Sequence, residues 1–395
     1  MKIVVFTETM LPEINGVAAS SSLLVEELRR LGHDVRAVTN SNPQAPKDET
    51  GVYRIPSIMF NFLQGRRVGT LYSRTVSKMM SEFKPDIIHT QTEFSVGLIG
   101  KAAAKRLNIP FVHTYHTLYK DYMHYLHLKN SNTVAQKFVS SASRSFCNAA
   151  TAVIVPSEKT GDVLLGYGVT SPIRNIPTGL KLAKLDPAAI PEEETTALRA
   201  SLGISPDEKI LLYLGRIAKE KNIDTIIRAM PEILRRDGGI RLLIVGGGTY
   251  LDYLKKCAAE LGVTGSIIFA GAVPFEDVGK YYRLGNVFIS ASSSETQGMT
   301  YFEALCAGLP IVVRRDECLK DVLLEGKNGW AFDSDEQIAE LVTRVFEDGE
   351  LRRLTRENVG YVPDKYFADT FARSVYGVYK EAVSLYAANP KENGN

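Results

Sequence analysis

Two basic residues near the middle of the chain stand at a spacing that could hold a diphosphate. Arg216 and Lys221 lie five positions apart in YLGRIAKEKNID (213–224), just after a short apolar run of the kind that forms a buried strand. Cations placed there would stabilise the negative charge on a leaving diphosphate, which helps the bond to it break. The alternative is two solvated surface cations, because Arg and Lys are mostly exposed in folded proteins.

Further along the chain, two carboxylates flank a glycine turn. In SSSETQGMTYFEALCAGLPIVV (292–313), a strand ends in a serine-rich loop that holds Glu295, and Gly298 precedes a helix expected to begin at about Met299. The N-terminus of such a helix would face phosphate groups. Glu303 lies about a turn into the helix, so one carboxylate could bind sugar hydroxyls and the other a ribose diol. A carboxylate pair could instead be the acid and base of glycoside hydrolysis.

Two other glycine turns follow apolar runs. The Asn-Gly turn at Gly16 leads from the first predicted strand into a helix, where glycine would let the backbone approach a phosphate closely; an ordinary strand-to-helix turn looks the same. A third turn begins with three glycines at Gly246. It does not match the dinucleotide-binding pattern Gly-x-Gly-x-x-Gly, because Leu251 occupies the third glycine position. The sequence therefore does not favour a dehydrogenase.

Histidines and paired aspartates raise the question of a metal. Four of the six histidines fall in HTYHTLYKDYMHYLHLK (113–129), namely His113, His116, His124 and His127. No His-Glu-x-x-His pattern is present, and the first two follow a strand, where alternate residues point to opposite faces. The Asp-x-Asp of FDSDE (332–336) is predicted to be a solvated turn after Trp330. We expect no metal site.

The elements that must position these residues alternate between strands and helices, in two series. Runs rich in β-branched residues occur at 2–7, 34–40, 86–91, 111–116 and 152–157, and again at 209–215, 241–248, 266–271, 287–292 and 310–315. This pattern predicts an α/β fold with two parallel sheets, each covered by helices on both faces. The Pro- and Glu-rich segment 181–208 indicates a connector followed by a short helix. After residue 362, a closing amphipathic helix is predicted from Phe367, Phe371, Val375, Val378 and Tyr379 at helical spacing.

The composition is typical of a globular protein without membrane-spanning helices. Of 395 residues, 45% are hydrophobic and 23% are charged, and no stretch approaches the roughly 18 uncharged apolar residues that a spanning helix needs. Glu8 and Pro12 interrupt the N-terminal apolar run where a signal peptide would continue. The four cysteines form no Cys-x-x-Cys pair, so neither a disulfide framework nor a zinc site is indicated, and a reducing cytoplasm is expected.

Charge is uneven along the chain, and one basic stretch is of a kind found at membrane surfaces. Residues 1–180 hold 20 Lys and Arg against 13 Asp and Glu, a net charge of +7, and the remainder carries −5. In SIMFNFLQGRRVGTLYSRTVSKMM (57–80), an apolar run precedes Arg66 and Arg67, and apolar residues then recur at helical spacing with Arg74 and Lys78 among them. This pattern is typical of an interfacial helix on anionic lipid. It is equally typical of a core-facing helix with basic flanks, and both interpretations stay open.

Together, these motifs resemble the retaining GT-B glycosyltransferases of family 4 (GT4), and within it the bacterial enzymes that glucosylate diacylglycerol. The resemblance spans nearly the whole chain. It rests on the Glu-x7-Glu motif in SETQGMTYFEAL (294–305), GRIAKEKN (215–222), the Asn15-Gly16 turn, IPTGL (176–180) and TYHTLYKDYMHYL (114–126). It implies a GT-B fold, in which two Rossmann-like domains, 1–180 and 200–362, face a cleft and the C-terminal helix (363–390) crosses back to the first domain.

The resemblance also implies roles for individual residues. Arg216 and Lys221 would bind the diphosphate, Glu295 the sugar hydroxyls and Glu303 the ribose. His116 would face the acceptor and the reacting carbon. The expected catalytic set is His116, Glu295, Arg216 and Lys221, and the donor site would be completed by Gly16, Gly246, Val273, Gly298, Met299 and Thr300. The expected contacts with the acceptor or the membrane are Arg66, Arg67, Arg74, Lys78, Tyr115 and Tyr119.

The activity that the resemblance implies is transfer of a hexose, glucose from UDP-glucose, onto diacylglycerol with retention of configuration. The expected partners are the nucleotide sugar, the lipid acceptor and an anionic membrane surface, with the enzyme cytoplasmic and peripherally attached to the inner face of the cell membrane. No cofactor, metal or nucleic acid is expected. Two alternatives stay open: a family 4 transferase acting on a phosphoinositide or a soluble acceptor, and a module that binds a nucleotide sugar without turnover. Where the common superfamily form has Glu-Gly-Phe-Gly, this chain has Glu-Thr-Gln-Gly at 295–298, so the sugar preference does not carry over directly.

Overall fold

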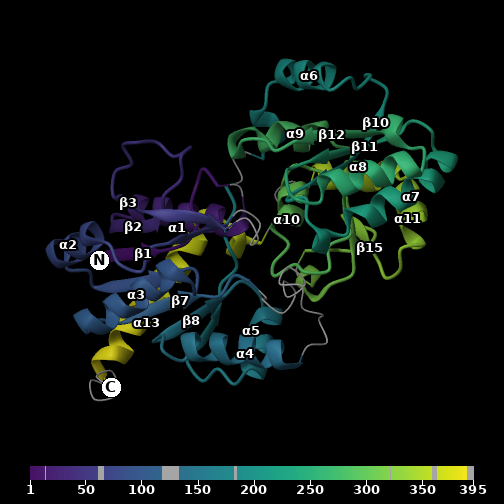
Figure 1. Ribbon diagram of the computed structural model, residues 1–395. Coiled ribbons are helices and arrows are strands. Elements are labelled where there is room, and N and C mark those ends of the chain that lie inside the picture. The colour runs from purple at the N-terminus through teal and green to yellow at the C-terminus, as the bar shows by residue number, and fades with distance from the viewer. Residues whose placement is uncertain are drawn as a thin grey trace. The chain divides into compact units, whose positions relative to one another are not determined.

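The computed structural model describes residues 1–13, 15–60, 66–117, 133–181, 185–320, 322–357 and 363–388. The chain divides into two compact units, Met1–Gly179 with Asp364–Asn395, and Leu180–Pro363. Each unit is built on a parallel β-sheet with helices packed against it (Figure 1). The predicted fold class, α/β with two Rossmann-like parallel-sheet domains, is confirmed.

The first unit holds a parallel sheet that, within the described residues, has seven strands. In spatial order these are β3 (Val52–Ile55), β2 (Asp34–Asn40), β1 (Lys2–Phe6), β6 (Ile87–Thr90), β7 (Phe111–Thr114), β8 (Ala152–Val155) and β9 (Ile173–Asn175). The chain builds outward from β1 on one side and from β6 on the other, so the strand order reverses between them. Ile3 and Val5 enter one core and Val4 and Phe6 another, because both faces of the sheet are covered.

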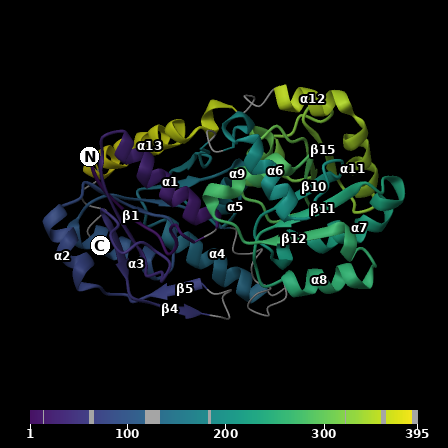
Figure 2. The same cartoon turned by 90° about the horizontal axis from the view of Figure 1, so that it is seen from above.

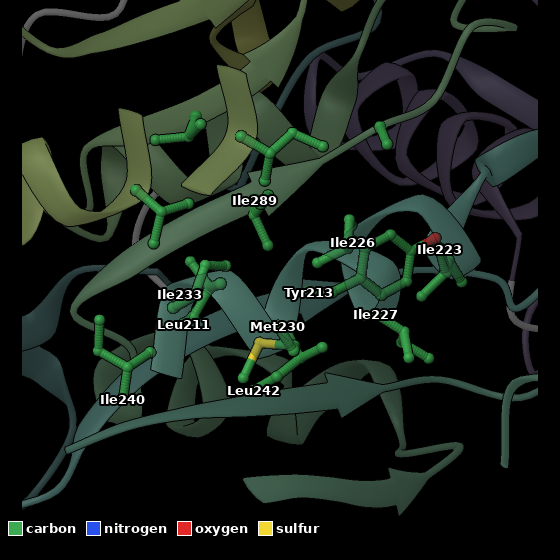
Figure 3. Close-up of a cluster of buried hydrophobic side chains, with 14 of the residues drawn as sticks. Leu211, Tyr213, Ile223, Ile226, Ile227, Met230, Ile233, Ile240, Leu242 and Ile289 are labelled. Atoms are coloured by element: carbon green, nitrogen blue, oxygen red, sulfur yellow. The ribbon is translucent and has the colours of Figure 1, made fainter. Parts of the chain in front are cut away.

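The second unit repeats this plan. Its sheet has, among the described residues, six parallel strands in the order β12 (Ile267–Gly271), β11 (Ile240–Val245), β10 (Lys209–Leu214), β13 (Val287–Ser290), β14 (Ile311–Arg314) and β15 (Gly329–Phe332). The strand order reverses between β10 and β13. Helix α7 (Ile223–Arg236) packs Ile226 and Met230 against Leu211 of β10 and Leu242 of β11, in a core of fully buried aliphatic side chains (Figure 3).

Most helices of the two units connect consecutive strands. In the first unit they are α1 (Gly16–Arg30), α2 (Arg74–Phe83), α3 (Ser95–Leu107), α4 (Thr133–Cys147) and α5 (Glu158–Gly166). In the second they are α6 (Glu192–Ser201), α7, α8 (Leu251–Glu260), α9 (Val278–Leu284), α10 (Met299–Cys306), α11 (Gln337–Glu347) and α12 (Gly349–Glu357). Of these, α6 precedes the second sheet, and α11 and α12 follow it. Asn15, Ser73 and Ser157 each accept a hydrogen bond from a first-turn amide, which fixes where α1, α2 and α5 begin.

The last helix, α13 (Ala368–Ala388), belongs to the first unit, as the resemblance implied. It lies along α1, and Figure 2 shows the two helices side by side. The predicted apolar stripe is buried there, with Phe371, Val375 and Tyr379 in the same core as β1. Gly179 lets the helix approach closely, because a Cβ at that position would lie 2.8 Å from the Cα of Ala368.

Residues 57–80 do not form the interfacial helix that was one of the two interpretations of this stretch. The segment contains an antiparallel hairpin, β4 (Ser57–Phe60) and β5 (Arg66–Gly69), and α2 begins only at Arg74. Val76 and Met79 of α2 are buried in the core with Phe83, so the core-facing alternative describes this helix. In the part of the chain that the structure describes, no helix is long and apolar enough to cross a membrane.

Candidate functional site

The predicted donor residues follow the two central strands of the second sheet. Arg216 comes two residues after β10, and Glu295 lies in the loop after β13. These neighbouring strands flank the point where the strand order reverses. In open α/β sheets, ligands bind beyond the carboxyl ends of the strands at such a point, because the loops diverge there and leave backbone groups accessible.

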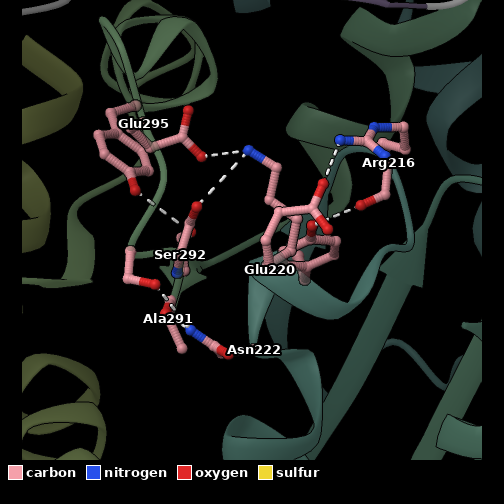
Figure 4. A network of polar contacts seen from close by, with 11 residues as sticks. Arg216, Glu220, Asn222, Ala291, Ser292 and Glu295 are labelled. Carbon is pink, nitrogen blue, oxygen red and sulfur yellow. Dashed lines mark hydrogen bonds and ion pairs between the residues drawn. The ribbon is translucent and has the colours of Figure 1, made fainter. Parts of the chain in front are cut away.

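Lys221 and Glu295 form an ion pair at this edge. The Nζ of Lys221 lies 2.6 Å from Oε1 of Glu295 and 3.5 Å from Oγ of Ser292. Both side chains remain partly accessible, with 17% of the lysine and 15% of the glutamate exposed. The next residue, Asn222, donates through Nδ2 to the carbonyl of Ala291, so the loops after β10 and β13 are tied together (Figure 4).

Arg216 is paired with Glu220, four residues along the chain (Figure 4). The Glu220 side chain is only 5% exposed, whereas 27% of the arginine is exposed. Tyr213 supports the loop, since its hydroxyl donates to the Arg216 carbonyl across 3.0 Å. Glu220 is a site residue that the sequence analysis missed. Its i,i+4 spacing from Arg216 was the available signal.

The glycine turn at Gly246 packs against the loop that carries Arg216. A Cβ at Gly246 would lie 1.8 Å from the Gly215 carbonyl oxygen, and one at Gly248 would lie 1.9 Å from that of Ile217. Both glycines have positive φ angles, 143° and 156°. Glycine is required here for close packing of two backbones. Val273, another predicted donor residue, is a buried side chain in the loop after β12.

Helix α10 carries the other predicted donor residues. Gly298 precedes it with a φ of 74°, and Met299 and Thr300 begin its first turn. As the N-cap residue, Gly298 has no side chain to accept a hydrogen bond from the first-turn amides. Glu303 lies partly buried on this helix, and its Oε2 accepts a hydrogen bond of 2.8 Å from the Tyr282 hydroxyl of α9. Burial raises the pKa of Glu303 to about 7, although the Tyr282 hydrogen bond acts in the opposite direction. Tyr282 was not predicted.

In the first unit, Gly16 begins α1. Asn15 caps the helix through a hydrogen bond from Ala18 N to its Oδ1, 2.9 Å long. Gly16 is exposed, its φ is not positive, and a Cβ added there would meet none of the described residues within 4 Å. Neither packing nor backbone strain within this unit therefore requires a glycine. Open space over a helix N-terminus is what the approach of an anion needs.

His116 stands two residues beyond β7, and it is partly buried. Its Nε2 lies 2.7 Å from Oε1 of Gln91, which follows β6. Burial, and next the nearby His113, lower the pKa of His116 to about 3, so the ring is neutral at ordinary pH. His113 instead contacts Glu93, with 3.1 Å between Nε2 and Oε1. Gln91 and Glu93 are further residues that the sequence analysis did not single out.

The residues predicted to contact the acceptor or the membrane lie in different environments. Tyr115 is fully buried, with its hydroxyl 3.0 Å from Oγ of Ser143, so it is a core residue, contrary to the predicted acceptor contact. Arg67 lies on β5 and is held within the hairpin, because its Nε donates a hydrogen bond to Oγ of Ser57 on β4. Arg74 and Lys78 are exposed on α2. The following residues lie outside the described side chains: Arg66, Tyr119, His124 and His127.

The Asp-x-Asp after β15 is a surface turn, as predicted. Asp333 and Asp335 are exposed and form ion pairs with Arg315 and Arg314. Among the described residues, no group of three or more His, Cys, Asp or Glu side chains is arranged to hold a metal ion.

The chain is similar along nearly its full length to two bacterial enzymes that have the same name. It is 34% identical over 385 residues to the alpha-monoglucosyldiacylglycerol synthase of Streptococcus pneumoniae, covering 97% of this chain and 86% of the relative. It is 33% identical to the synthase of the same name from Acholeplasma laidlawii, covering 97% and 98%. Residues 14–184 match the family model described as "Glycosyltransferase Family 4". This chain is a family 4 glycosyltransferase.

The remaining comparisons concern the second unit and the fold. Residues 194–359 of the glycosyltransferase match the model described as "Glycosyl transferases group 1". The crystal structure of Anabaena HepE in complex with UDP and glucose superposes on the glycosyltransferase with a TM-score of 0.75 at 16% sequence identity, covering 96% of this chain and 99% of HepE. At that identity the likeness shows a shared fold.

Proposed function

We propose that this glycosyltransferase transfers glucose from UDP-glucose to diacylglycerol, with retention of configuration, at an anionic membrane surface. The observation that carries the proposal is the identity of 34% and 33%, over 97% of the chain, to two relatives named alpha-monoglucosyldiacylglycerol synthase. Both relatives match the first unit as well as the second. If the first unit binds the acceptor, a difference in acceptor would be expected to appear there.

The donor half of the proposal is supported by the charges at the edge of the second sheet. Arg216 and Lys221 are held by Glu220 and Glu295, so in the absence of ligand each cation has a carboxylate partner. A diphosphate offers stronger, multidentate acceptors, and Arg binds such groups through two parallel hydrogen bonds. When Lys221 turns to phosphate, Glu295 is left available to accept hydrogen bonds from sugar hydroxyls. HepE, which shares the fold, has been crystallised with UDP and glucose.

The proposed chemistry needs charge stabilisation more than a nucleophile. The bond between the anomeric carbon and the diphosphate oxygen breaks, the acceptor hydroxyl oxygen attacks from the same face, and its proton passes to the departing phosphate oxygen. Arg216 and Lys221 would stabilise the charge on that leaving group without a metal. His116, whose pKa is about 3, would be neutral and would orient the acceptor hydroxyl by accepting a hydrogen bond from it. The hydroxyl proton would still pass to the phosphate oxygen and not stay on His116.

The lipid half of the proposal is supported by exposed apolar side chains in the first unit. They occur on the β4–β5 hairpin and in the turn after it: Ile58, Met59, Leu71 and Tyr72 are 73%, 54%, 69% and 66% exposed. The basic residues Arg74 and Lys78 follow directly on α2. Apolar side chains next to cations are the composition that favours binding to the headgroup region of anionic bilayers.

The experiment is transfer from radiolabelled UDP-glucose, with other nucleotide sugars in parallel, to diacylglycerol in mixed micelles containing anionic lipid. Thin-layer separation identifies the product, and digestion with α- or β-glucosidase reports its configuration. A labelled lipid that only α-glucosidase cleaves is the expected result. Label in a phosphoinositide or a soluble acceptor, but none in diacylglycerol, would contradict the proposed acceptor; donor binding with no transfer to any acceptor would indicate a binding module.

A further inference from the structure

A chain of buried polar side chains connects the C-terminal helix to His116. The hydroxyl of Tyr379 on α13 lies 2.6 Å from Nδ1 of His89, and Nε2 of His89 lies 2.7 Å from Oγ1 of Thr114. Gln91 comes next, with its amide between His89 and His116. Tyr379 and His89 are fully buried and Gln91 is 2% exposed, so water does not compete for these hydrogen bonds.

The contacts of Gln91 assign the orientation of its amide group. The atom assigned as Nε2 lies 3.2 Å from Nδ1 and 3.1 Å from Nε2 of His89. An atom that close to both ring nitrogens lies over the face of the ring, since a position in the ring plane would clash with the carbon between them. The face of an aromatic ring is electron-rich and attracts an N–H group rather than a carbonyl oxygen. The Gln91 carbonyl is therefore the end that faces His116.

This orientation determines which nitrogen of His116 carries the proton. Because Oε1 of Gln91 can only accept, the His116 Nε2 at 2.7 Å must be the N–H donor. The ring is neutral, since burial holds its pKa at about 3, so Nδ1 keeps a lone pair. No hydrogen bond to that Nδ1 comes from the residues that the structure describes.

We propose that Gln91 is a positioning residue that holds His116 in its Nε2–H tautomer and leaves Nδ1 to accept the hydrogen bond of the acceptor hydroxyl. His89 and Tyr379 hold Gln91 in turn, so the C-terminal helix takes part in orienting His116. The proposal rests on the proposed function in one respect, the role of His116 towards the acceptor. The tautomer itself is a property of the enzyme without substrates.

The tautomer can be measured directly in the full-length protein. Long-range proton–nitrogen NMR on enzyme labelled with ¹⁵N-histidine distinguishes the two neutral tautomers, and six histidines give a spectrum that can be assigned. The His116 signals are those that His116→Ala removes. At mildly alkaline pH we expect the Nε2–H form in the wild type, loss of that preference in Gln91→Met, and its retention in Gln91→Glu, which keeps an acceptor oxygen. An Nδ1–H form in the wild type, or an unchanged tautomer in folded Gln91→Met, overturns the proposal.

Kinetics supply a second readout. Misplacing a reacting group by about 1 Å can reduce turnover on the order of 100-fold, so Gln91→Met should lower kcat about 10- to 100-fold while the KM for the nucleotide sugar stays within about twofold. Gln91→Glu should recover part of that loss.

Tyr379→Phe should lower kcat by a smaller factor, and the matched control on the same helix is Tyr376→Phe, whose ring packs on His33. Equal loss of kcat in Tyr376→Phe and Tyr379→Phe, or unchanged kcat in Gln91→Met, contradicts the proposal. If the wild type transfers glucose to no lipid, the proposed function fails and the NMR result still decides the tautomer.

Discussion

The Tyr282 hydroxyl donates a hydrogen bond to Glu303 Oε2 across 2.8 Å, and it joins α9 to the carboxylate expected to bind the ribose of the donor. Burial raises the pKa of Glu303 to about 7, and this hydrogen bond partly offsets the rise by stabilising the charged form. An ionised carboxylate accepts stronger hydrogen bonds from a diol than a neutral carboxyl group does. Tyr282 therefore helps to keep Glu303 in the form that would best make the proposed ribose contact at neutral pH.

Removing that hydroxyl should make nucleotide binding more dependent on pH. In Tyr282→Phe the pKa of Glu303 rises further, so a smaller fraction of it is ionised at neutral pH. We expect UDP affinity to fall about 10-fold near pH 7, in line with roughly 1.5–3 kcal/mol for a hydrogen bond to a charged group, and to recover in part as the pH rises. Calorimetric titration with UDP from pH 6 to 9 tests this, with Tyr281→Phe as the neighbouring control. A loss of affinity that is the same at every pH would contradict the proposed cause.

Arg216 should have separable roles in folding and in binding. Arg216→Ala leaves the largely buried Glu220 without its cation, which should lower the free energy of unfolding by about 1–3 kcal/mol as well as weaken UDP binding. The double variant Arg216→Ala/Glu220→Gln removes the carboxylate charge that has lost its Arg216 partner, so it should regain stability but not UDP affinity. Denaturant unfolding and UDP titration of both variants and of Glu220→Gln measure this. Recovery of both properties in the double variant would argue against a phosphate contact by Arg216.

Replacing Gly16 and Gly246 by alanine should have opposite effects on stability. At Gly16 a Cβ meets no described residue within 4 Å, and replacing a helical Gly by Ala usually stabilises by about 0.4–1 kcal/mol. Gly16→Ala should therefore be at least as stable as the wild type, yet should weaken donor binding if phosphate approaches that backbone. Gly246→Ala should be strongly destabilised, because its Cβ would lie 1.8 Å from the Gly215 carbonyl oxygen. Thermal unfolding and UDP titration distinguish the two, and a Gly16→Ala variant with full affinity would remove Gly16 from the donor site.

His116→Ala should separate chemistry from donor binding. His116 belongs to the first unit, whereas Arg216, Lys221 and Glu295 belong to the second. We expect the variant to lose most turnover, about 100-fold or more as for the loss of a positioned catalytic group, while UDP affinity stays within about twofold. Single-turnover transfer and UDP titration on the same preparation measure both quantities. A comparable loss of turnover and of affinity would contradict the role assigned to His116.

Apart from β12, which lies at the edge of its sheet, the strands that the sequence predicted are the buried, central ones. β10 and β11 are six-residue runs of nearly uninterrupted Leu, Ile and Val, a pattern that few other elements produce. The missed strands β3, β9 and β15 are three or four residues long and lie at the edges of their sheets. The edge strands β3 and β9 are covered less completely, so their sequences (VYRI and IRN) mix polar and apolar residues. β15 is mostly buried, but its four residues (GWAF) hold a glycine and no β-branched residue, so it lacks the usual strand signal.

The hairpin within 57–80 was missed because apolar residues from separate elements recur at helical spacing along the sequence. Val68 lies on β5, Leu71 and Tyr72 in a turn, and Val76 on α2, yet their spacing of three or four residues imitates one helix face. Candidate site residues were predictable where a strand end placed them, as for Arg216 and Glu295. Tyr282 and Gln91 were not predictable in this way, because their partners Glu303 and His116 lie on other elements and only the tertiary fold brings each pair together.

The exposed apolar residues of the hairpin and of the turn after it should govern binding to lipid. Because Ile58, Met59, Leu71 and Tyr72 are at least half exposed, replacing all four by Ser should leave thermal stability nearly unchanged. Flotation with vesicles of anionic phospholipid should show at least 10-fold weaker binding, since inserting even one large apolar side chain contributes about 1.5–3 kcal/mol. Leu324→Ser, an exposed leucine of the second unit, is the control.

Charge reversal at Arg74 and Lys78 should also weaken binding to these vesicles, by about 1 kcal/mol for each basic residue lost near the surface. These two residues are a cleaner test than Arg67, whose Nε donates to Ser57 and supports the hairpin. The charge effect should diminish in vesicles of zwitterionic lipid and at high salt, because exposed charges are then screened, whereas the effect of the four Ser substitutions should remain. If both sets of variants bind anionic vesicles like the wild type, this segment is not the surface that contacts lipid.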